Sequence, residues 1–183
     1  MQHSKKSRTL IKSFEILAAL SDNLEQVHVN EDPDPYDNDT PREIVMASIS
    51  KKDCQAVYDW ATKKFPEIPR KNMVHPDKYH ITIIATTSKF KKQYPLKENI
   101  IVPVDITSTK LLGPNKDTLV LLVKSPWLMW RYKVARMCGG TSTWPTYIPH
   151  ITIASDVGKY EPANFHPFTV HVTGETLSDF QSS

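Results

Sequence analysis

The residues of this chain best suited to chemistry are two histidines, which each begin the same tetrapeptide, His-Ile-Thr-Ile. One copy starts at His80 and the other at His150. Successive side chains of a β-strand point to opposite faces, so each histidine shares a face with the threonine two positions later, and both isoleucines take the other face. Each copy therefore offers an imidazole and a hydroxyl, from Thr82 or Thr152, to a cleft. Because imidazoles gain and lose protons near neutral pH, the pair predicts acid–base catalysis.

A third His-x-Thr, which begins at His171, tests how specific this pattern is. Its fourth position is Gly174 rather than an aliphatic residue, and it follows the second copy too closely to begin another equivalent half. We therefore expect His171 to be an ordinary strand histidine. Only the two extended copies, separated by the length of a small lobe, indicate a functional repeat.

The composition is that of a globular protein. The chain has 183 residues, of which 39% are hydrophobic and 23% charged, enough for one domain or two small lobes packed together. No apolar stretch is long enough to cross a membrane. Cys54 and Cys138 are too few for a disulfide framework and too isolated for a metal cluster. These features predict a cytoplasmic protein with no membrane contact and no obligate protein partner.

The net charge of +3 hides an uneven distribution. Residues 21–40 include seven acidic and no basic residues, whereas from residue 41 onward 19 Lys and Arg stand against 12 Asp and Glu. A basic body suits a ligand that carries phosphate, although surface lysines usually only solvate a face. Residues 1–41, with a predicted helix at 7–20 and a proline-rich linker at 30–41, form an appendage of unassigned role. Residues 42–183 form the domain proper.

The pattern of apolar residues predicts two related halves. In the first half, a strand and a helix precede the first histidine strand, and in the second half two strands and a helix precede the second. The expected strands are 43–50, 79–85, 100–112, 118–124, the run after Pro149 and 168–173; the expected helices are 51–65, ended by Pro66, and 127–137, ended by Gly139-Gly140. The two halves should face each other across a cleft.

Both histidine motifs resemble those of the 2H phosphoesterase superfamily, which is named for two His-hydrophobic-Thr/Ser-hydrophobic motifs. Within it, the chain is most similar to the phage anti-CBASS nuclease family. The stretches that carry this resemblance are Leu-Gly-Pro-Asn-Lys at 112–116, Leu-Val-Leu-Leu-Val at 119–123, Ser-Pro-Trp-Leu at 125–128 and Trp-Pro-Thr-Tyr-Ile-Pro-His-Ile-Thr-Ile at 144–153. The similarity covers roughly residues 43–176 and is strongest around the second motif.

The resemblance implies both a fold and a function. The fold is α+β and bilobal with pseudo-two-fold symmetry (LigT-like), in which two antiparallel sheets form a central cleft and the helices lie outside. The implied activity is the destruction of cyclic di- and trinucleotide messengers, such as 3′,3′-cGAMP, with which infected bacteria trigger defence. A phage-encoded protein would act in the cytoplasm of its host. Glu175 occupies the place of a family glutamate that is implicated in the ligand pocket, with an ordinary surface carboxylate as the alternative.

Two histidines suffice for the implied chemistry. One can deprotonate a ribose 2′-OH while the other protonates the departing 5′-oxygen, and the hydroxyls of Thr82 and Thr152 can donate hydrogen bonds to the phosphate. Since the copies are identical, the assignment of base and acid stays open. We expect no cofactor and no metal, because two histidines without a carboxylate cluster make a poor magnesium site and no zinc spacing is present.

Aromatic residues before the second motif are candidates for base recognition, because every nucleobase has a face that can stack. Trp144 and Tyr147 are the predicted substrate contacts, with core packing as the alternative for each. Two other functions also stay open: a 2H phosphoesterase that acts on RNA ends (2′,3′-cyclic phosphates or 2′–5′ linkages), and a catalytically idle nucleotide-binding module.

Overall fold

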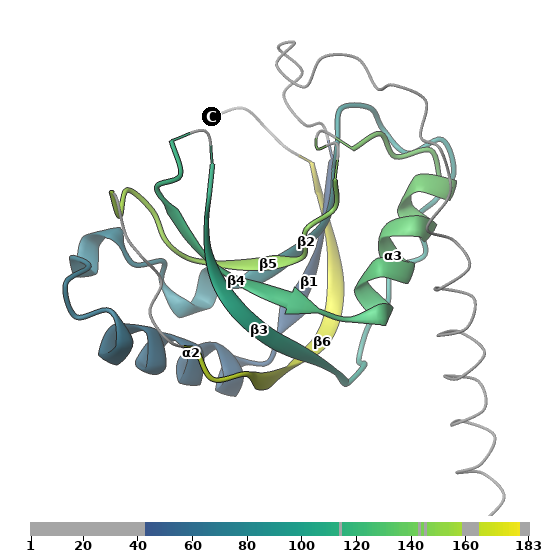
Figure 1. The fold of residues 1–183 in the computed structure, drawn as a ribbon. Helices are drawn as coiled ribbons and strands as arrows, with labels where there is room; N and C mark the ends of the chain where they lie inside the picture. Colours follow the sequence, from purple (N-terminus) through teal and green to yellow (C-terminus); the bar gives the residue numbers. More distant parts are fainter. Residues whose placement is uncertain (1–42, 114, 143, 145, 159–164, 180–183) are drawn as a thin grey trace, which may run out of the picture. The chain divides into compact units, whose positions relative to one another are not determined.

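The computed structural model describes residues 43–113, 115–142, 144, 146–158 and 165–179, which form an α+β arrangement (Figure 1). The predicted appendage, 1–41, lies outside the described residues, as does the position of its boundary. The elements in chain order are β1 (Glu43–Ile49), α2 (Lys51–Lys64), η1 (Arg70–Asn72), η2 (Pro76–Lys78), β2 (His80–Thr86), β3 (Val102–Leu112), β4 (Thr118–Lys124), α3 (Pro126–Met137), β5 (His150–Ala154) and β6 (Phe168–Asp179). The strands and helices predicted from residue 43 onward are confirmed, and β6 is longer than expected, whereas the helix predicted at 7–20 lies outside the described residues.

Local sequence signals explain where both α-helices begin. The side chain of Ser50 accepts a hydrogen bond from the backbone N–H of Asp53 and caps α2. Ser125 caps α3 in the same way by accepting from the N–H of Leu128, and Pro126 occupies the first turn, where its missing N–H costs nothing. At the end of α3, Gly139 takes a positive φ of 93°, which favours glycine.

The six strands form a single sheet in the order β2-β1-β6-β3-β4-β5, and every paired neighbour is antiparallel. The two histidine strands, β2 and β5, are therefore the two edges of this sheet. The sheet is bent so strongly that these edges contact each other (Figure 1). Bending thus brings together two motifs that lie at opposite ends of the strand order.

One continuous sheet replaces the two sheets that the family resemblance implied, and the reason is the length of β6. Its N-terminal part, from Phe168 to Val172, pairs with β3, whereas its C-terminal part, from Val172 to Asp179, pairs with β1. Each half of the chain contributes a histidine strand and the strand beside it. Because β6 spans twelve residues, it joins both halves into one hydrogen-bonded sheet.

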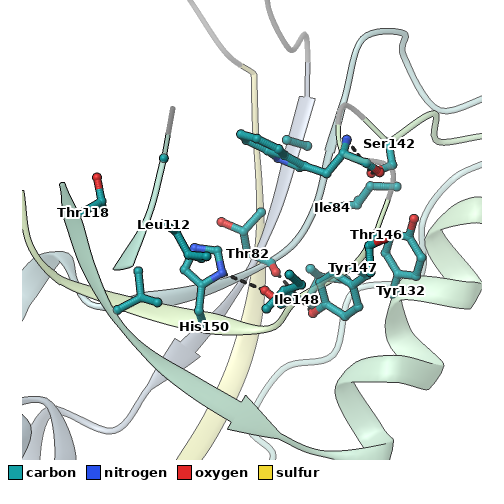
Figure 2. Close-up of a pocket in the computed structure, with 15 residues that line it drawn as sticks. Thr82, Ile84, Leu112, Thr118, Tyr132, Ser142, Thr146, Tyr147, Ile148 and His150 are labelled. Atoms are coloured by element: carbon teal, nitrogen blue, oxygen red, sulfur yellow. Dashed lines mark hydrogen bonds between the residues drawn. The ribbon is translucent and has the colours of Figure 1, made fainter. Parts of the chain in front are cut away.

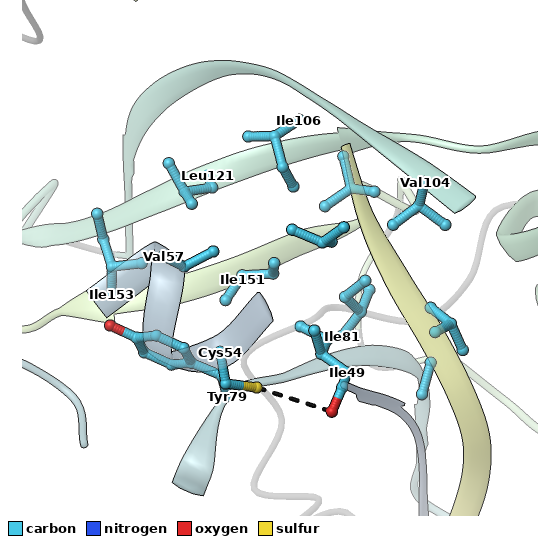
Figure 3. Close-up of a cluster of buried hydrophobic side chains, with 14 of the residues drawn as sticks. Ile49, Cys54, Val57, Tyr79, Ile81, Val104, Ile106, Leu121, Ile151 and Ile153 are labelled. Atoms are coloured by element: carbon cyan, nitrogen blue, oxygen red, sulfur yellow. Dashed lines mark hydrogen bonds between the residues drawn. The ribbon is translucent and has the colours of Figure 1, made fainter. Parts of the chain in front are cut away.

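The isoleucines of both tetrapeptides anchor the histidine strands in the core, as the alternation predicts. Ile81, Ile83, Ile151 and Ile153 are all fully buried. They belong to one apolar cluster that also includes Val57 of α2 and side chains from β3 and β4 (Figure 3). Burying four such side chains stabilises the fold by several kcal/mol, at about 1.5–3 kcal/mol each. The same burial fixes which face of each strand the histidines occupy.

The two α-helices pack against different parts of the sheet. Residues of α2 contribute Cys54, Val57 and Ala61 to the core, and α3 contributes Leu128 and Ala135 and contacts β2. Among the described residues, no helix is both long and apolar enough to cross a membrane.

Candidate active site

The two histidines are held by the same local hydrogen bond. The Nδ1 atom of His80 lies 2.8 Å from the backbone carbonyl oxygen of Lys78, and Nδ1 of His150 lies 2.7 Å from that of Ile148. In each copy the carbonyl belongs to the residue two positions before the histidine. The repeat in sequence is therefore a repeat in side-chain geometry.

This hydrogen bond determines how each ring can act. A carbonyl oxygen can only accept, so Nδ1 of each imidazole must carry the proton and donate it. The neutral ring then has its lone pair on Nε2, and the charged ring has an N–H there. For both histidines, the described part of the chain offers Nε2 no hydrogen-bond partner, so in either copy this atom can accept a proton or donate one.

The threonines lie on the strand faces that the histidines share. Thr82 and Thr152 are both half-buried, in contrast to the isoleucines on either side of them. Thr82 is opposite Met46 of β1, and Thr152 is opposite Val120 of β4. Each threonine therefore lies two residues after its histidine, on the face of the sheet opposite the buried isoleucines.

A pocket of about 340 Å³ opens between β2, β5, the end of the β3–β4 hairpin and the segment before β5 (Figure 2). Its lining is mostly apolar and aromatic, and its polar groups are mainly hydroxyls. The residues that line it are Thr82, Ile83, Ile84, Ala85, Leu112, Gly113, Thr118, Val120, Tyr132, Ser142, Trp144, Thr146, Tyr147, Ile148 and His150.

Four of the predicted site residues line this pocket: Thr82, Trp144, Tyr147 and His150. His80 and Thr152 are not among its lining residues. His80 is exposed at the start of β2, and Thr152 lies two positions beyond His150. The structure therefore places the second histidine in the wall of the pocket and the first one on the same strand as the pocket residue Thr82.

Tyr147 links the two histidine strands. Its hydroxyl donates a 3.2 Å hydrogen bond to the backbone carbonyl oxygen of Thr82. Its ring stacks on Tyr132 of α3, with centroids 4.4 Å apart and planes within 7° of parallel. Burial raises the pKa of Tyr147 far above its usual range, so the hydroxyl keeps its proton and remains a donor. Tyr147 is thus a structural bridge as well as a part of the pocket wall.

Trp144 differs from the buried aromatic residues because its side chain is 63% exposed. Its backbone N–H donates to the hydroxyl of Ser142 at 3.1 Å, and that hydroxyl donates to the Trp144 carbonyl oxygen at 2.9 Å. A large exposed indole that lines a pocket is well placed to stack against a ligand. Plain core packing, the alternative interpretation of Trp144, does not fit this exposure.

Glu175 lies elsewhere than the family resemblance implied. It is buried and is not among the pocket-lining residues, and Arg131 of α3 binds both of its carboxylate oxygens, at 2.5 and 2.7 Å. Tyr94 and the backbone N–H of Lys97 donate to the same carboxylate. Burial alone would lower the pKa of Arg131, but the hydrogen bonds to Glu175 outweigh it and raise the pKa, so the guanidinium stays charged. The carboxylate fastens α3 to β6 and has no oxygen left for a ligand.

His171 has the structural role expected of it. Asp53 at the start of α2 accepts hydrogen bonds from the backbone N–H of His171 at 2.8 Å and from its ring nitrogen Nδ1 at 3.0 Å. The described residues contain no group of three or more His, Cys, Asp or Glu side chains that could hold a metal ion.

Comparison with known proteins agrees with this geometry. Residues 44–182 match the model of the family described as anti-CBASS protein Acb1. The chain belongs to this family. The match covers every element from β1 to β6 except the first residue of β1, so the family relationship applies to the whole of the described fold.

Two curated phage proteins of this family are similar to the chain. The anti-CBASS protein Acb1 of Acinetobacter phage Ac42 is 37% identical over 91 residues, which are 49% of this chain and 59% of that protein. The anti-CBASS protein Acb1 of Vibrio phage KVP40 is 29% identical over 90 residues, which are 47% of this chain and 56% of that protein. The chain thus spans less than two thirds of the length of each relative.

Solved structures show the same fold. Escherichia coli LigT complexed with 3′-AMP superposes with a TM-score of 0.52 at 15% identity, covering 78% of this chain and 90% of LigT. The protein TT0787 of Thermus thermophilus superposes with a TM-score of 0.54 at 14% identity, covering 74% and 86% of the two chains. The LigT-like α+β fold that the motifs predicted is therefore confirmed.

Several residues that line the pocket were not predicted from the sequence. Tyr132 lies on α3, where an amphipathic pattern indicates only which residues face the core. Leu112 and Thr118 flank the turn of a hairpin, and Ser142 lies in an irregular segment. The spacing of the sequence gives no signal for any of them, because each reaches the pocket only through the bending of the sheet.

Proposed function

We propose that this protein is a metal-independent phosphodiesterase that degrades cyclic di- and trinucleotide messengers, such as 3′,3′-cGAMP, and so protects a phage from CBASS immunity. The observation that carries the proposal is the matched pair of imidazoles, in which a carbonyl fixes Nδ1 and leaves Nε2 available. Cleavage of a ribonucleotide phosphodiester by the adjacent 2′-OH needs one proton acceptor and one proton donor. The duplicated motif supplies one of each.

In the proposed reaction, Nε2 of one neutral imidazole takes the proton of a ribose 2′-OH as its oxygen attacks the adjacent phosphorus. The bond from phosphorus to the 5′-oxygen breaks, and Nε2–H of the other, charged imidazole protonates the departing oxygen. A 2′,3′-cyclic phosphate forms at the cut, and the ring of the messenger opens. His80 and His150 are the proposed pair, and either of them can be the base and the other the acid.

The hydroxyls of Thr82 and Thr152 are proposed to stabilise the negative charge that builds on the non-bridging phosphate oxygens. Both lie on the same strand faces as the histidines, one pleat away. Preorganised donors of this kind typically contribute about 10²–10³ in rate when they are aimed at developing charge. No other side chain is needed for the charge on the phosphate.

The pocket supports a nucleotide as the ligand. Its volume of about 340 Å³ lies in the range of small-molecule sites, and its aromatic lining suits a stacked base. We propose Trp144 as the residue on which a base stacks and Tyr147 as a wall of the same pocket. LigT, which shares the fold, was solved with 3′-AMP, and a nucleotide ligand for the present chain is consistent with that.

The test is an incubation of the purified protein in EDTA with cyclic di- and trinucleotides, 2′–5′ oligoadenylates and RNA that carries a 2′,3′-cyclic phosphate. We expect linear products from the cyclic messengers, undiminished by EDTA, and formation of these products slowed by about 10²–10⁴ in the His80→Ala and His150→Ala variants. His171→Ala is the matched control and should keep its activity, because that histidine faces Asp53.

Other product patterns would contradict the proposal. Processing of RNA ends with intact cyclic messengers would assign the protein to the RNA-end branch of the 2H enzymes. Binding of nucleotides without any turnover would identify a nucleotide-binding module. Full activity in His80→Ala would refute the two-histidine mechanism.

A further inference from the structure

The segment that carries Trp144 is fastened to the first histidine strand by hydroxyl groups. The hydroxyl of Thr86, at the end of β2, accepts a 3.0 Å hydrogen bond from the backbone N–H of Thr141 and lies 3.3 Å from the Thr141 hydroxyl. Thr86 is fully buried, and a strand-type bridge pairs it with Ser142. We refer to Thr86, Thr141 and Ser142 as the hydroxyl latch.

The latch controls the backbone of Trp144 directly. The hydroxyl of Ser142 bonds both the N–H and the carbonyl oxygen of Trp144, at 3.1 and 2.9 Å. Because the indole is 63% exposed, packing on the protein contributes little to its position. The backbone hydrogen bonds of the latch therefore fix the position of the Trp144 backbone at the pocket.

A second attachment point lies on the other side of Trp144. The hydroxyl of Tyr147 bonds the backbone carbonyl oxygen of Thr82, which is four residues before Thr86 on the same strand. In the chain, Trp144 thus lies between two residues, Thr141 and Tyr147, that are both hydrogen-bonded to β2. The segment before the second histidine is held by the strand of the first.

We propose that Thr86 is a positioning residue, which fixes Trp144 as a preformed wall of the nucleotide pocket. The proposal rests on the proposed function, since it takes the ligand to be a nucleotide. A wall that is already ordered loses less conformational freedom on binding than one that must be ordered by the ligand. Loss of the Thr86 hydroxyl should therefore raise KM and leave kcat almost unchanged, because Thr86 does not touch the reacting groups.

The first test uses the free protein. In Thr86→Val, which keeps the shape of the side chain and removes its hydroxyl, amide hydrogen exchange at Trp144 should accelerate about tenfold as its local protection falls. The acceptor of that N–H, Ser142, is unchanged, so the acceleration reports the position of the segment. Thr86→Ser, which retains a hydroxyl, and Thr169→Val, a strand threonine bonded to Asp105, should stay within about twofold of the wild type.

The second test measures turnover of 3′,3′-cGAMP in a double-mutant cycle. Thr86→Val should raise KM about 5- to 10-fold in the wild-type background and less than about twofold in the Trp144→Ala background, because the two residues act together. Thr141→Ala, on an exposed residue, replaces Thr86→Val if that variant does not fold, and the same direction is expected.

The outcomes separate the two proposals. An unchanged exchange rate at Trp144, or an equal rise in KM in both backgrounds, would overturn the role of Thr86. If the wild-type protein cleaves none of the cyclic di- and trinucleotides, the proposed function fails, and the exchange measurement still decides whether the latch positions Trp144.

Discussion

The two copies of His-Ile-Thr-Ile share their chemistry and differ in their surroundings. Both imidazoles bond a carbonyl two residues earlier, and all four isoleucines are fully buried. The short η2 turn precedes His80, which is exposed, whereas the segment with Trp144 and Tyr147 precedes His150, which lines the pocket. The duplication therefore supplies two imidazoles with equivalent hydrogen bonds, and only the second copy is preceded by aromatic residues that line the pocket.

The chemical equivalence of the two copies is tested most strongly by removing each imidazole in turn. His80→Ala and His150→Ala should each lower kcat by about 10²–10⁴, because either loss removes one of the two proton transfers. Single-turnover rates with 3′,3′-cGAMP would measure this. The double variant should be slower than either single one, but by less than the product of the two single losses, since the histidines act together. A large loss in only one variant would show that the copies are not chemically equivalent.

The pH dependence should reveal which copy is the base. One imidazole must be neutral and the other charged, so kcat/KM should fall on both sides of an optimum, by about tenfold per pH unit. In the residual activity of each single variant, one limb of the profile should disappear. The variant that loses the acidic limb lacks the base, and the other lacks the acid. Loss of the same limb in both variants would contradict the assignment of opposite roles.

The difference in binding residues between the two copies is tested at Trp144. Trp144→Ala should raise KM by roughly 5- to 150-fold with little change in kcat, which corresponds to the loss of about 1–3 kcal/mol of stacking on one base. Trp130→Ala is the matched control, because Trp130 is also partly exposed but lies outside the pocket lining. Equal effects on KM in the two variants would remove Trp144 from the ligand site.

Gly140, which follows the C-terminal end of α3, has little room for a side chain. A substitution there should therefore lower stability. A Cβ at Gly140 would lie 2.7 Å from Phe90 and 3.1 Å from the carbonyl oxygen of Ala135. Gly140→Ala should therefore lower the free energy of unfolding by about 1–3 kcal/mol in denaturant titrations. The control is Gly174→Ala, where the nearest atom would be at 3.4 Å, and a comparable loss there would contradict the steric reason.

His171, the histidine of the third His-x-Thr, should affect stability only, through its contact with Asp53. This is the smallest of the expected effects. Burial alone would raise the pKa of Asp53, but hydrogen bonds with Ser50 and His171 outweigh it and lower the pKa. A lowered folded-state pKa means that the ionised carboxylate adds stability above its ordinary range, and this stability is lost as the pH falls through the folded-state value. Asp53→Asn should be less stable than the wild type at neutral pH, and the gap should close as the pH falls below the ordinary pKa range of an aspartate. Thermal unfolding at several pH values measures this, and a gap independent of pH would contradict it.

The sequence predicted most of the elements because their signals are local. The serine caps, the proline at the start of α3 and the isoleucine alternation act within a few residues, and β2, β5 and both α-helices follow from them. Glu175 shows where such reasoning ends. The family resemblance implied a ligand contact for it, but its partner, Arg131, is 44 residues away in the chain and could not be found from spacing.

Local sequence was enough to specify the groups that we propose to be reactive: two imidazoles, two hydroxyls and the faces on which they lie, since strand alternation follows from backbone geometry alone. Whether those groups lie near one another depends on the tertiary structure. The length of β6 made one sheet out of two halves, its bending brought the edge strands into contact, and the contacts of Thr86 and Tyr147 attached the segment with Trp144 to the opposite edge. These are long-range pairings, and their energy depends on the whole core rather than on any local pattern.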